Sequence, residues 1–270
     1  MKEAVSIAAV ETARFTMDYA VFGRGARPFL IIPGMGLQTV IPGAAEAVAE
    51  LYRTYAELYK VYIIEWRREL PAGHSVRDMA RDIAETMEAL GIKEADVFSA
   101  SLGGMIAQVL AAEYPELVHK VVLGSTLALP NELQRENFAE WIELAKAGDP
   151  VPLNRSFARR VYSPETQAAR RELFAAIEGM GTPEEMRRFI TLAEACRDFS
   201  YYEELAKIRC PVLVLGGGKD LVFGEEASVK IAEKLGCPCY IYENCAHAAY
   251  DEAPDYLERM LRFFLGIRRV

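Results

Sequence analysis

The chain has 270 residues, of which 51% are hydrophobic and 26% are charged. This composition excludes a largely disordered, collagen-like or coiled-coil protein, and a chain of this length needs no disulfide or metal to stabilise its core. The 31 basic and 39 acidic residues give a net charge of −8, which repels phosphate backbones. Nucleic acid is therefore not an expected partner.

The sequence lacks the patterns of a secreted, membrane-spanning or metal-binding protein. The first residues, MKEAVSIAAVETARF, contain no apolar core of signal-peptide length. The longest uncharged stretch, 28–45, is interrupted by prolines and glycines and does not form a continuous apolar span. Five cysteines and three histidines support neither a disulfide framework nor a zinc site. We expect a cytoplasmic protein without membrane association or bound metal.

Short apolar runs alternate with helical patterns along most of the chain. The first twenty-odd residues alternate loosely, as in an antiparallel hairpin at the edge of a sheet. Further strands are expected at 29–32, 61–64, 97–98, 118–123, 211–215 and 239–242, and helices at 42–58, 75–90, 102–113, 225–235 and 252–265. This order predicts an α/β fold: a mostly parallel sheet of about eight strands with helices on both faces.

The alternation stops between residues 127 and 206. This stretch contains several helical patterns and no convincing strand. It is too long for a loop and too short for an independent domain of typical size. We expect a helical lid (cap) over 127–206, inserted into a core domain that comprises 1–126 and 207–270.

The sharpest local pattern is FSASLGG at 98–104, between an expected strand and an expected helix. A nucleophile on such a turn has a strained backbone, so the residues two positions away must be small. Here they are Ser99 and Gly103 around Ser101, and the following helix would direct its N–H groups at an oxyanion on that serine. The alternative is an inert serine in a turn of small residues.

A nucleophilic serine needs a base, and the base needs an acid that orients it. His247 follows the expected strand 239–242 and precedes the last helix, which makes it the best base. The other histidines fit less well, because His74 lies in an expected loop and His119 begins a strand. A purely structural histidine is the alternative for His247.

The acid is expected in a loop at the same end of the sheet. Asp220 follows LVLGGGK, a strand that runs into three glycines, and the chain order Ser, Asp, His suits a triad. Glu225 and Glu226 are rivals, but a place in the first helical turn explains them through the helix dipole. The alternative for Asp220 is a turn-forming residue.

A second oxyanion donor is expected from another loop. The segment IPGMG at 32–36 follows a strand and is rich enough in glycine to bring a backbone N–H close to Ser101. Met35 is the donor by position, and a plain tight turn is the alternative. No GxGxxG opens a helix, and Gly216–Lys219 lacks the spacing of a P-loop, so no cofactor is expected.

Taken together, these segments resemble the α/β-hydrolase fold superfamily over nearly all of the chain. The resemblance implies that Ser101 is the nucleophile, Asp220 the acid and His247 the base. It also implies an oxyanion hole formed by the backbone N–H groups of Leu102 and Met35.

The sequence departs from the family pattern at two points. The oxyanion loop of the family usually opens with His-Gly, whereas this chain has Pro33-Gly34. The glycine that usually precedes the nucleophile by two positions is replaced by Ser99. The first departure removes a side chain that often supports the loop, and the second keeps a small residue.

The expected activity is that of a serine hydrolase acting on a small-molecule ester or lactone of a carboxylic acid. A carbon–carbon bond hydrolase of a dienone-type substrate is the alternative within enzymes, with perhydrolase activity as a further variant. A hydrolase-like receptor that holds a small apolar ligand with little turnover is the alternative from another class. The substrate and the oligomeric state, with a homodimer among the options, stay open at this point.

Overall fold

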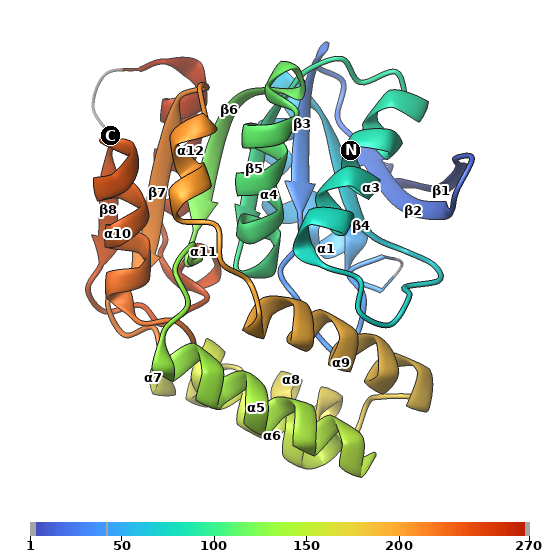
Figure 1. The fold of residues 1–270 in the computed structure, drawn as a ribbon, viewed down its shortest axis with the longest axis vertical. Helices are drawn as coiled ribbons and strands as arrows, with labels where there is room; N and C mark the ends of the chain where they lie inside the picture. The colour runs from blue at the N-terminus through green and yellow to red at the C-terminus, as the bar shows by residue number, and fades with distance from the viewer. Residues whose placement is uncertain (1–3, 42, 268–270) are drawn as a thin grey trace.

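The fold is built on one eight-stranded sheet. The computed structural model describes residues 4–41 and 43–267, and its strands are ordered β1-β2-β4-β3-β5-β6-β7-β8 (Figure 1). β1 and β2 form an antiparallel hairpin at one edge, β2 pairs antiparallel with β4, and every later pair is parallel. The strands are β1 Ser6–Glu11, β2 Thr16–Phe22, β3 Arg27–Ile32, β4 Tyr59–Arg67, β5 Ala95–Ala100, β6 Val118–Gly124, β7 Val212–Gly217 and β8 Cys239–Tyr242. The mostly parallel sheet expected from the sequence is confirmed.

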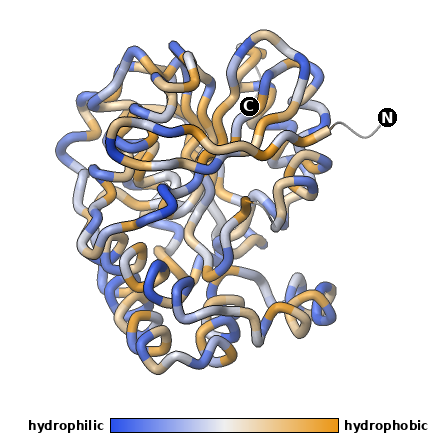
Figure 2. The backbone as a smooth tube through the Cα atoms, turned by 90° about the vertical axis from the view of Figure 1, so that its right-hand side faces the viewer, coloured by the Kyte–Doolittle hydropathy of each residue, from blue (hydrophilic) through white to orange (hydrophobic). Residues whose placement is uncertain are grey.

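Helices cover both faces of this sheet. Alternate residues of β3 enter different hydrophobic clusters: Leu30 and Ile32 pack with α3 and α4, whereas Phe29 and Ile31 pack with α1, α2 and α12. The helices outside the β6–β7 connection are α1 Ala45–Leu51, α2 Arg53–Leu58, α3 Val76–Ala89, α4 Leu102–Glu113, α10 Glu225–Leu235, α11 Ala249–Glu252 and α12 Tyr256–Leu265, with a short 3-10 helix η1 at Pro115–Leu117. Every residue of β5 and β7 is buried, as a sheet covered on both faces requires. Figure 2 shows hydrophobic stretches (orange) recurring along the chain between hydrophilic ones (blue).

Two expected helices are each divided in the structure. The pattern over 42–58 predicts one helix, but α1 and α2 meet at Tyr52, whose buried ring packs 6.2 Å from Phe29 and 5.3 Å from Tyr55 between ring centroids. The helix expected over 252–265 begins only at Tyr256, because Pro254 has no N–H to continue a helix and separates α12 from α11, which ends at Glu252. Side-chain packing sets the first division, and backbone chemistry sets the second.

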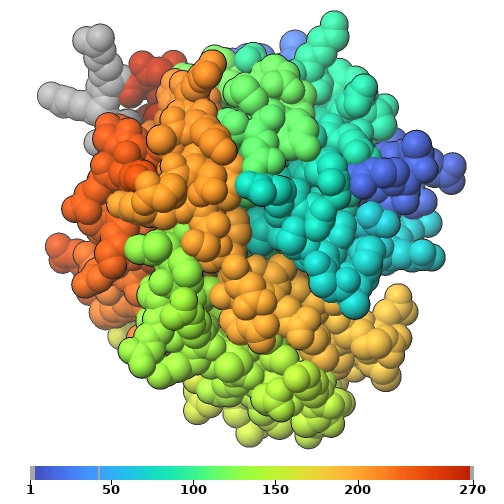
Figure 3. Space-filling view, in the orientation of Figure 1, coloured from blue at the N-terminus to red at the C-terminus, as the bar shows by residue number. Residues whose placement is uncertain are grey.

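The connection between β6 and β7 carries five α-helices, which we call the inserted helices. They are α5 Glu132–Ala147, α6 Pro150–Val161, α7 Pro164–Ala169, α8 Arg171–Ile177 and α9 Pro183–Arg197, followed by a 3-10 helix η2 at Glu203–Lys207. Figure 1 places them beyond the carboxyl ends of the parallel strands, and in Figure 3 α9 (gold) lies between α5 and the rest of the chain. The division into a core and a separate lid domain stays a prediction.

The chain contains two tryptophans, one on the sheet and one among the inserted helices. Trp66 lies on β4 and is 7% exposed. Trp141 lies on α5, is 1% exposed, and donates its indole N–H to Ser156 Oγ at 3.1 Å. Over the described residues 4–41 and 43–267, no helix combines the length and the apolar character that crossing a membrane requires.

Candidate active site

Ser101 occupies a strained position between β5 and α4. Its backbone angles are φ 57° and ψ −127°, in the left-handed half of the Ramachandran map that side chains other than glycine rarely adopt. β6 and the segment that follows it both bind this backbone: the Ser101 N–H donates to Gly124 O at 3.0 Å, and Thr126 Oγ1 donates to Ser101 O at 2.8 Å. Sequence reasoning missed Thr126, although its place just after a strand was a usable signal.

The small residues around Ser101 are required by the close approach of other segments. A Cβ on Gly103 would lie 2.2 Å from Ile32 O, and one on Gly104 would lie 2.7 Å from Thr126 Cβ. Ser99, which stands where the family usually has glycine, is completely buried at the end of β5. The expectation that only small residues fit here therefore agrees with the packing.

Asp220 and His247 form a buried hydrogen-bonded pair. Asp220 follows β7 and His247 follows β8, and Asp220 Oδ2 lies 2.8 Å from His247 Nδ1. The other carboxylate oxygen, Oδ1, accepts the N–H groups of Val222 at 2.7 Å and Phe223 at 3.0 Å. Because both oxygens are occupied, the carboxylate has one defined orientation toward the imidazole.

Phe223 also contacts the histidine directly, which the sequence did not indicate. Its ring meets the His247 imidazole edge-on, with centroids 5.1 Å apart, and it stacks on Phe138 of α5 at 6.0 Å. This apolar contact and the Asp220 bond restrict the imidazole to one plane. His247 is 3% exposed.

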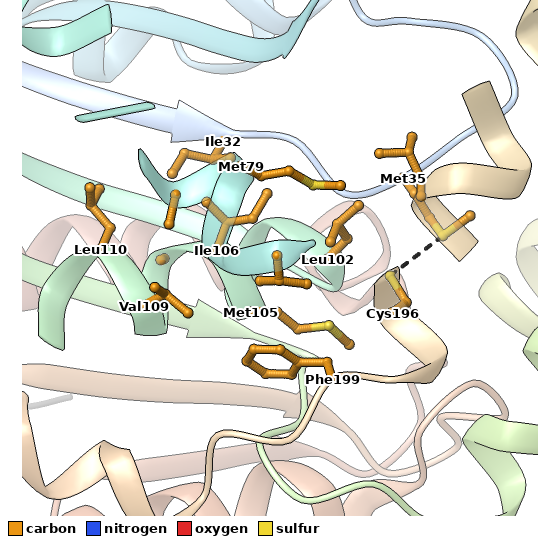
Figure 4. Close-up of a cluster of buried hydrophobic side chains, with 14 of the residues drawn as sticks. Ile32, Met35, Met79, Leu102, Met105, Ile106, Val109, Leu110, Cys196 and Phe199 are labelled. Atoms are coloured by element: carbon orange, nitrogen blue, oxygen red, sulfur yellow. Dashed lines mark hydrogen bonds between the residues drawn. The ribbon is translucent and has the colours of Figure 1, made fainter. Parts of the chain in front are cut away.

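The loop after β3 passes close to Ser101. A Cβ built on Gly34 would lie 3.2 Å from Ser101 Cβ and 3.9 Å from its Oγ. The Met35 side chain points away, toward Cys196 of α9, with the two sulfur atoms 3.8 Å apart (Figure 4). Within the described residues, neither the Met35 N–H nor the Leu102 N–H donates a hydrogen bond, which leaves both amides available to a bound oxygen.

The structure does not join all the predicted residues by direct bonds. Ser101, Asp220 and His247 all follow parallel strands and so lie at the same edge of the sheet, but no hydrogen bond links Ser101 Oγ to His247 in the described part of the chain. The other two histidines belong elsewhere: His74 pairs with Asp82 at 2.7 Å, and His119 pairs with Asp96 at 2.6 Å. His74 lies in a loop as expected, but it is buried.

Two cavities on the described part of the chain lie away from this site, the larger of them, of about 670 Å³, beside the end of α3. The other, of about 590 Å³, lies between the start of α3 and the end of α9. None of the five predicted site residues lines either cavity. The candidate active site is therefore defined by the arrangement of its polar residues and not by a cavity.

Comparison with known proteins settles the family. The sequence model of the alpha/beta hydrolase fold matches residues 22–254. The chain belongs to the α/β hydrolase fold family. Solved α/β hydrolases superimpose on it closely: MGS-M2, from a Medee basin deep-sea metagenome library, gives a TM-score of 0.85 at 18% identity, covering 97% of this chain and 98% of the other. The enol-lactonase of Burkholderia xenovorans LB400 gives 0.83 at 17% identity, with 97% and 100% covered.

Curated relatives of this α/β hydrolase are named for several hydrolytic reactions. A protein of Caulobacter sp. (strain K31) named "Putative carbamate hydrolase RutD" is 28% identical over 173 residues, which is 62% of this chain and 63%, less than two thirds, of that relative. The 3-oxoadipate enol-lactonase 2 of Acinetobacter baylyi (strain ATCC 33305 / BD413 / ADP1) is 24% identical over 211 residues, 76% of each chain. The pyrrolizixenacetamide deacetylase of Xenorhabdus hominickii is 25% identical over 202 residues, 70% of this chain and 72% of the other. These relatives support a hydrolase of small substrates.

Proposed function

We propose that this α/β hydrolase cleaves a small carboxylic ester or lactone through a Ser101–His247–Asp220 triad and an acyl-enzyme. The observation that carries the proposal is the buried Asp220–His247 pair at the same sheet edge as the strained Ser101. A carboxylate whose second oxygen is already occupied by two amides can orient an imidazole and stabilise its charged form. A positive φ at a non-glycine residue between a strand and a helix, as at Ser101, is typical of a nucleophile held on a turn.

The proposed reaction proceeds in two steps. His247 Nε2 takes the proton of Ser101 Oγ as that oxygen attacks the substrate carbonyl, and the N–H groups of Met35 and Leu102 hold the resulting oxyanion. The protonated His247 donates to the departing alcohol, and an acyl-enzyme remains. Water activated by His247 then attacks the ester carbon, and the acid leaves as Ser101 recovers its proton.

The names of the relatives favour one second candidate, the cleavage of a C–N bond at the same site. A carbamate hydrolase and a deacetylase are among them. The same triad serves that chemistry if His247 protonates an amine instead of an alcohol. Comparing kcat/KM for an ester and an anilide of the same acyl group, together with a lactone and a carbamate of similar size, separates the two candidates.

Labelling with a fluorophosphonate tests the nucleophile directly. We expect one adduct on Ser101, located by intact mass and peptide mapping, and none in Ser101→Ala. The variant should lose at least about 10⁴-fold in turnover while its unfolding midpoint stays near that of the wild type, because triad members act as a unit. Undiminished hydrolysis by Ser101→Ala would refute the triad. A folded protein that is labelled by neither the fluorophosphonate nor a smaller organophosphate would favour a ligand-binding role instead.

A further inference from the structure

The loop that carries His247 is attached to the inserted helices through one carboxylate. Glu252, at the end of α11, accepts the N–H of Ala246 on Oε2 at 2.7 Å and the N–H of Ser163 on Oε1 at 2.7 Å. Ala246 directly precedes His247, and Ser163 is the N-cap of α7. A single side chain thus connects the backbone beside the proposed base to the junction of α6 and α7.

The opposite side of His247 is held by the same junction. The Ala248 N–H donates to Val161 O, the last residue of α6, at 2.9 Å. The backbone N–H groups on either side of His247 are therefore both tied to the α6–α7 junction. The Ala248 N–H bonds to it directly, and the Ala246 N–H bonds to Glu252, which in turn accepts the Ser163 N–H. Next to Glu252, Asp251 forms an ion pair with Arg170, which lies between α7 and α8.

The two amides that meet Glu252 belong to buried residues, so their hydrogen bonds matter. Ser163 is 5% exposed and Ala246 is 3% exposed. A buried amide left without a partner is destabilising, whereas an ionised carboxylate gives each amide a charge-assisted bond. An apolar residue at position 252 would free both amides and release the backbone next to His247.

We propose that Glu252 is a positioning residue for His247 and that, through it, the α6–α7 junction sets the place of the base relative to Ser101. This inference rests on the proposed function. Asp220 and Phe223 fix the plane of the imidazole. Glu252 fixes the backbone from which the imidazole extends. A displaced base loses rate steeply, because catalysis needs reacting atoms within hydrogen-bond reach of each other.

The first test replaces Glu252 by glutamine, which keeps its size but loses the charge and one acceptor. In Glu252→Gln we expect kcat to fall about 10-fold or more, with KM within about twofold, because the substrate contacts are untouched and only the base moves. Glu258→Gln is the matched control: its carboxylate is 65% exposed and, among the residues that the structure describes, pairs with Arg262 at 2.9 Å. Its kcat should equal that of the wild type.

The second test removes the partner amide instead of the carboxylate. Ser163 has φ −62° and ψ 154°, and Tyr162 before it is extended at φ −117° and ψ 146°, so both residues accept a proline at position 163. Ser163→Pro deletes the N–H that meets Glu252, but it also removes the hydroxyl that caps α7. Ser163→Ala loses only the hydroxyl and is the control.

Ser163→Pro should lower kcat by at least about fivefold relative to Ser163→Ala at unchanged KM, since the substrate contacts stay intact. In the double variant Ser163→Pro should lower kcat little further than Glu252→Gln alone, because both changes break the same link between Ala246 and Ser163. Equal kcat in Glu252→Gln and Glu258→Gln would overturn the inference. So would equal kcat in the two Ser163 variants, a comparison that decides the question even if Glu252→Gln does not fold.

A readout independent of turnover separates this inference from the proposed function. Amide hydrogen exchange of the peptide 243–250 should be faster in Glu252→Gln than in Glu258→Gln, with the rest of the sheet unchanged. A wild-type chain that neither hydrolyses esters nor takes up a phosphonate would refute the proposed function alone. Unchanged exchange in 243–250 would refute the Glu252 bridge whether or not the chain is active.

Discussion

Replacing Gly103 by alanine sets two physical effects against each other. Gly103 lies in the first turn of α4, where helix propensity alone predicts that alanine stabilises the protein by about 1 kcal/mol. The structure predicts the opposite sign. The new Cβ would lie 2.2 Å from Ile32 O and 2.7 Å from Pro33 O, and both neighbours are backbone atoms without a rotamer to change.

The size of the effect follows from these distances. Real Cβ atoms essentially never approach closer than 3.0 Å, so α4 and the end of β3 must separate by about 0.8 Å. Overpacking of a well-packed interior costs about 1–3 kcal/mol, and a backbone neighbour places this site at the upper end. The same shift moves Ser101 away from the Gly34–Met35 loop, and a displacement near 1 Å can lower a catalytic rate about 100-fold.

Urea unfolding and the rate of phosphonate labelling at Ser101 measure the two consequences. We expect Gly103→Ala to lose about 2 kcal/mol or more of unfolding free energy and to label at least about 10-fold more slowly. Gly179→Ala is the control, because nothing lies within 4 Å of the position its Cβ would take. It should stay within about 0.5 kcal/mol of the wild type. A Gly103→Ala protein as stable and as reactive as the wild type would refute the steric reasoning.

Three further outcomes are expected. Asp220→Asn keeps an oxygen for the two amides but faces His247 with an NH₂ group, so kcat should fall about 10⁴-fold with little change in the unfolding midpoint; a loss below 10-fold would contradict this role. Burial raises the pKa of Glu65 to about 7, above the value of about 4.3 expected in the unfolded chain, so the fold favours its protonated form. The unfolding free energy should fall between about pH 4 and pH 7, by up to about 3 kcal/mol, and Glu65→Gln should flatten this slope in urea titrations. Iodoacetamide should modify exposed Cys239 in the native protein but Cys196 only in denaturant, because complete burial shields the Cys196 thiol and raises its pKa. Mass spectrometry of the peptides measures both.

The strand pattern of this chain could be predicted because the strands are buried on both faces. Runs such as FLII at 29–32 have no polar interruption, and turn residues bound them. The division at Tyr52 could not be predicted, because it depends on aromatic rings contributed by β3 and α2. The division at Pro254 was visible in the sequence, and a stricter use of the proline rule would have placed the start of α12 correctly.

The site was predictable where chemistry restricts the residue type. Ser101, Asp220 and His247 each follow a strand, and a parallel sheet brings such positions to one edge. The residues that support them were harder to predict, because a threonine, a phenylalanine and a glutamate have many ordinary uses, and the place of Thr126 just after a strand was the one usable signal. Thr126 contacts Ser101 across 25 residues of chain and Phe223 contacts His247 across 24, whereas Glu252 joins Ala246, six residues away, to Ser163 across 89.

The two tryptophans make this protein its own spectroscopic reporter. Trp66 is embedded in the sheet and Trp141 among the inserted helices, and both are nearly inaccessible to solvent. Replacing one of them by phenylalanine leaves an emission signal from a single region of the chain. Fluorescence followed through a denaturant gradient in the two variants would then reveal whether these regions lose their structure together or in sequence.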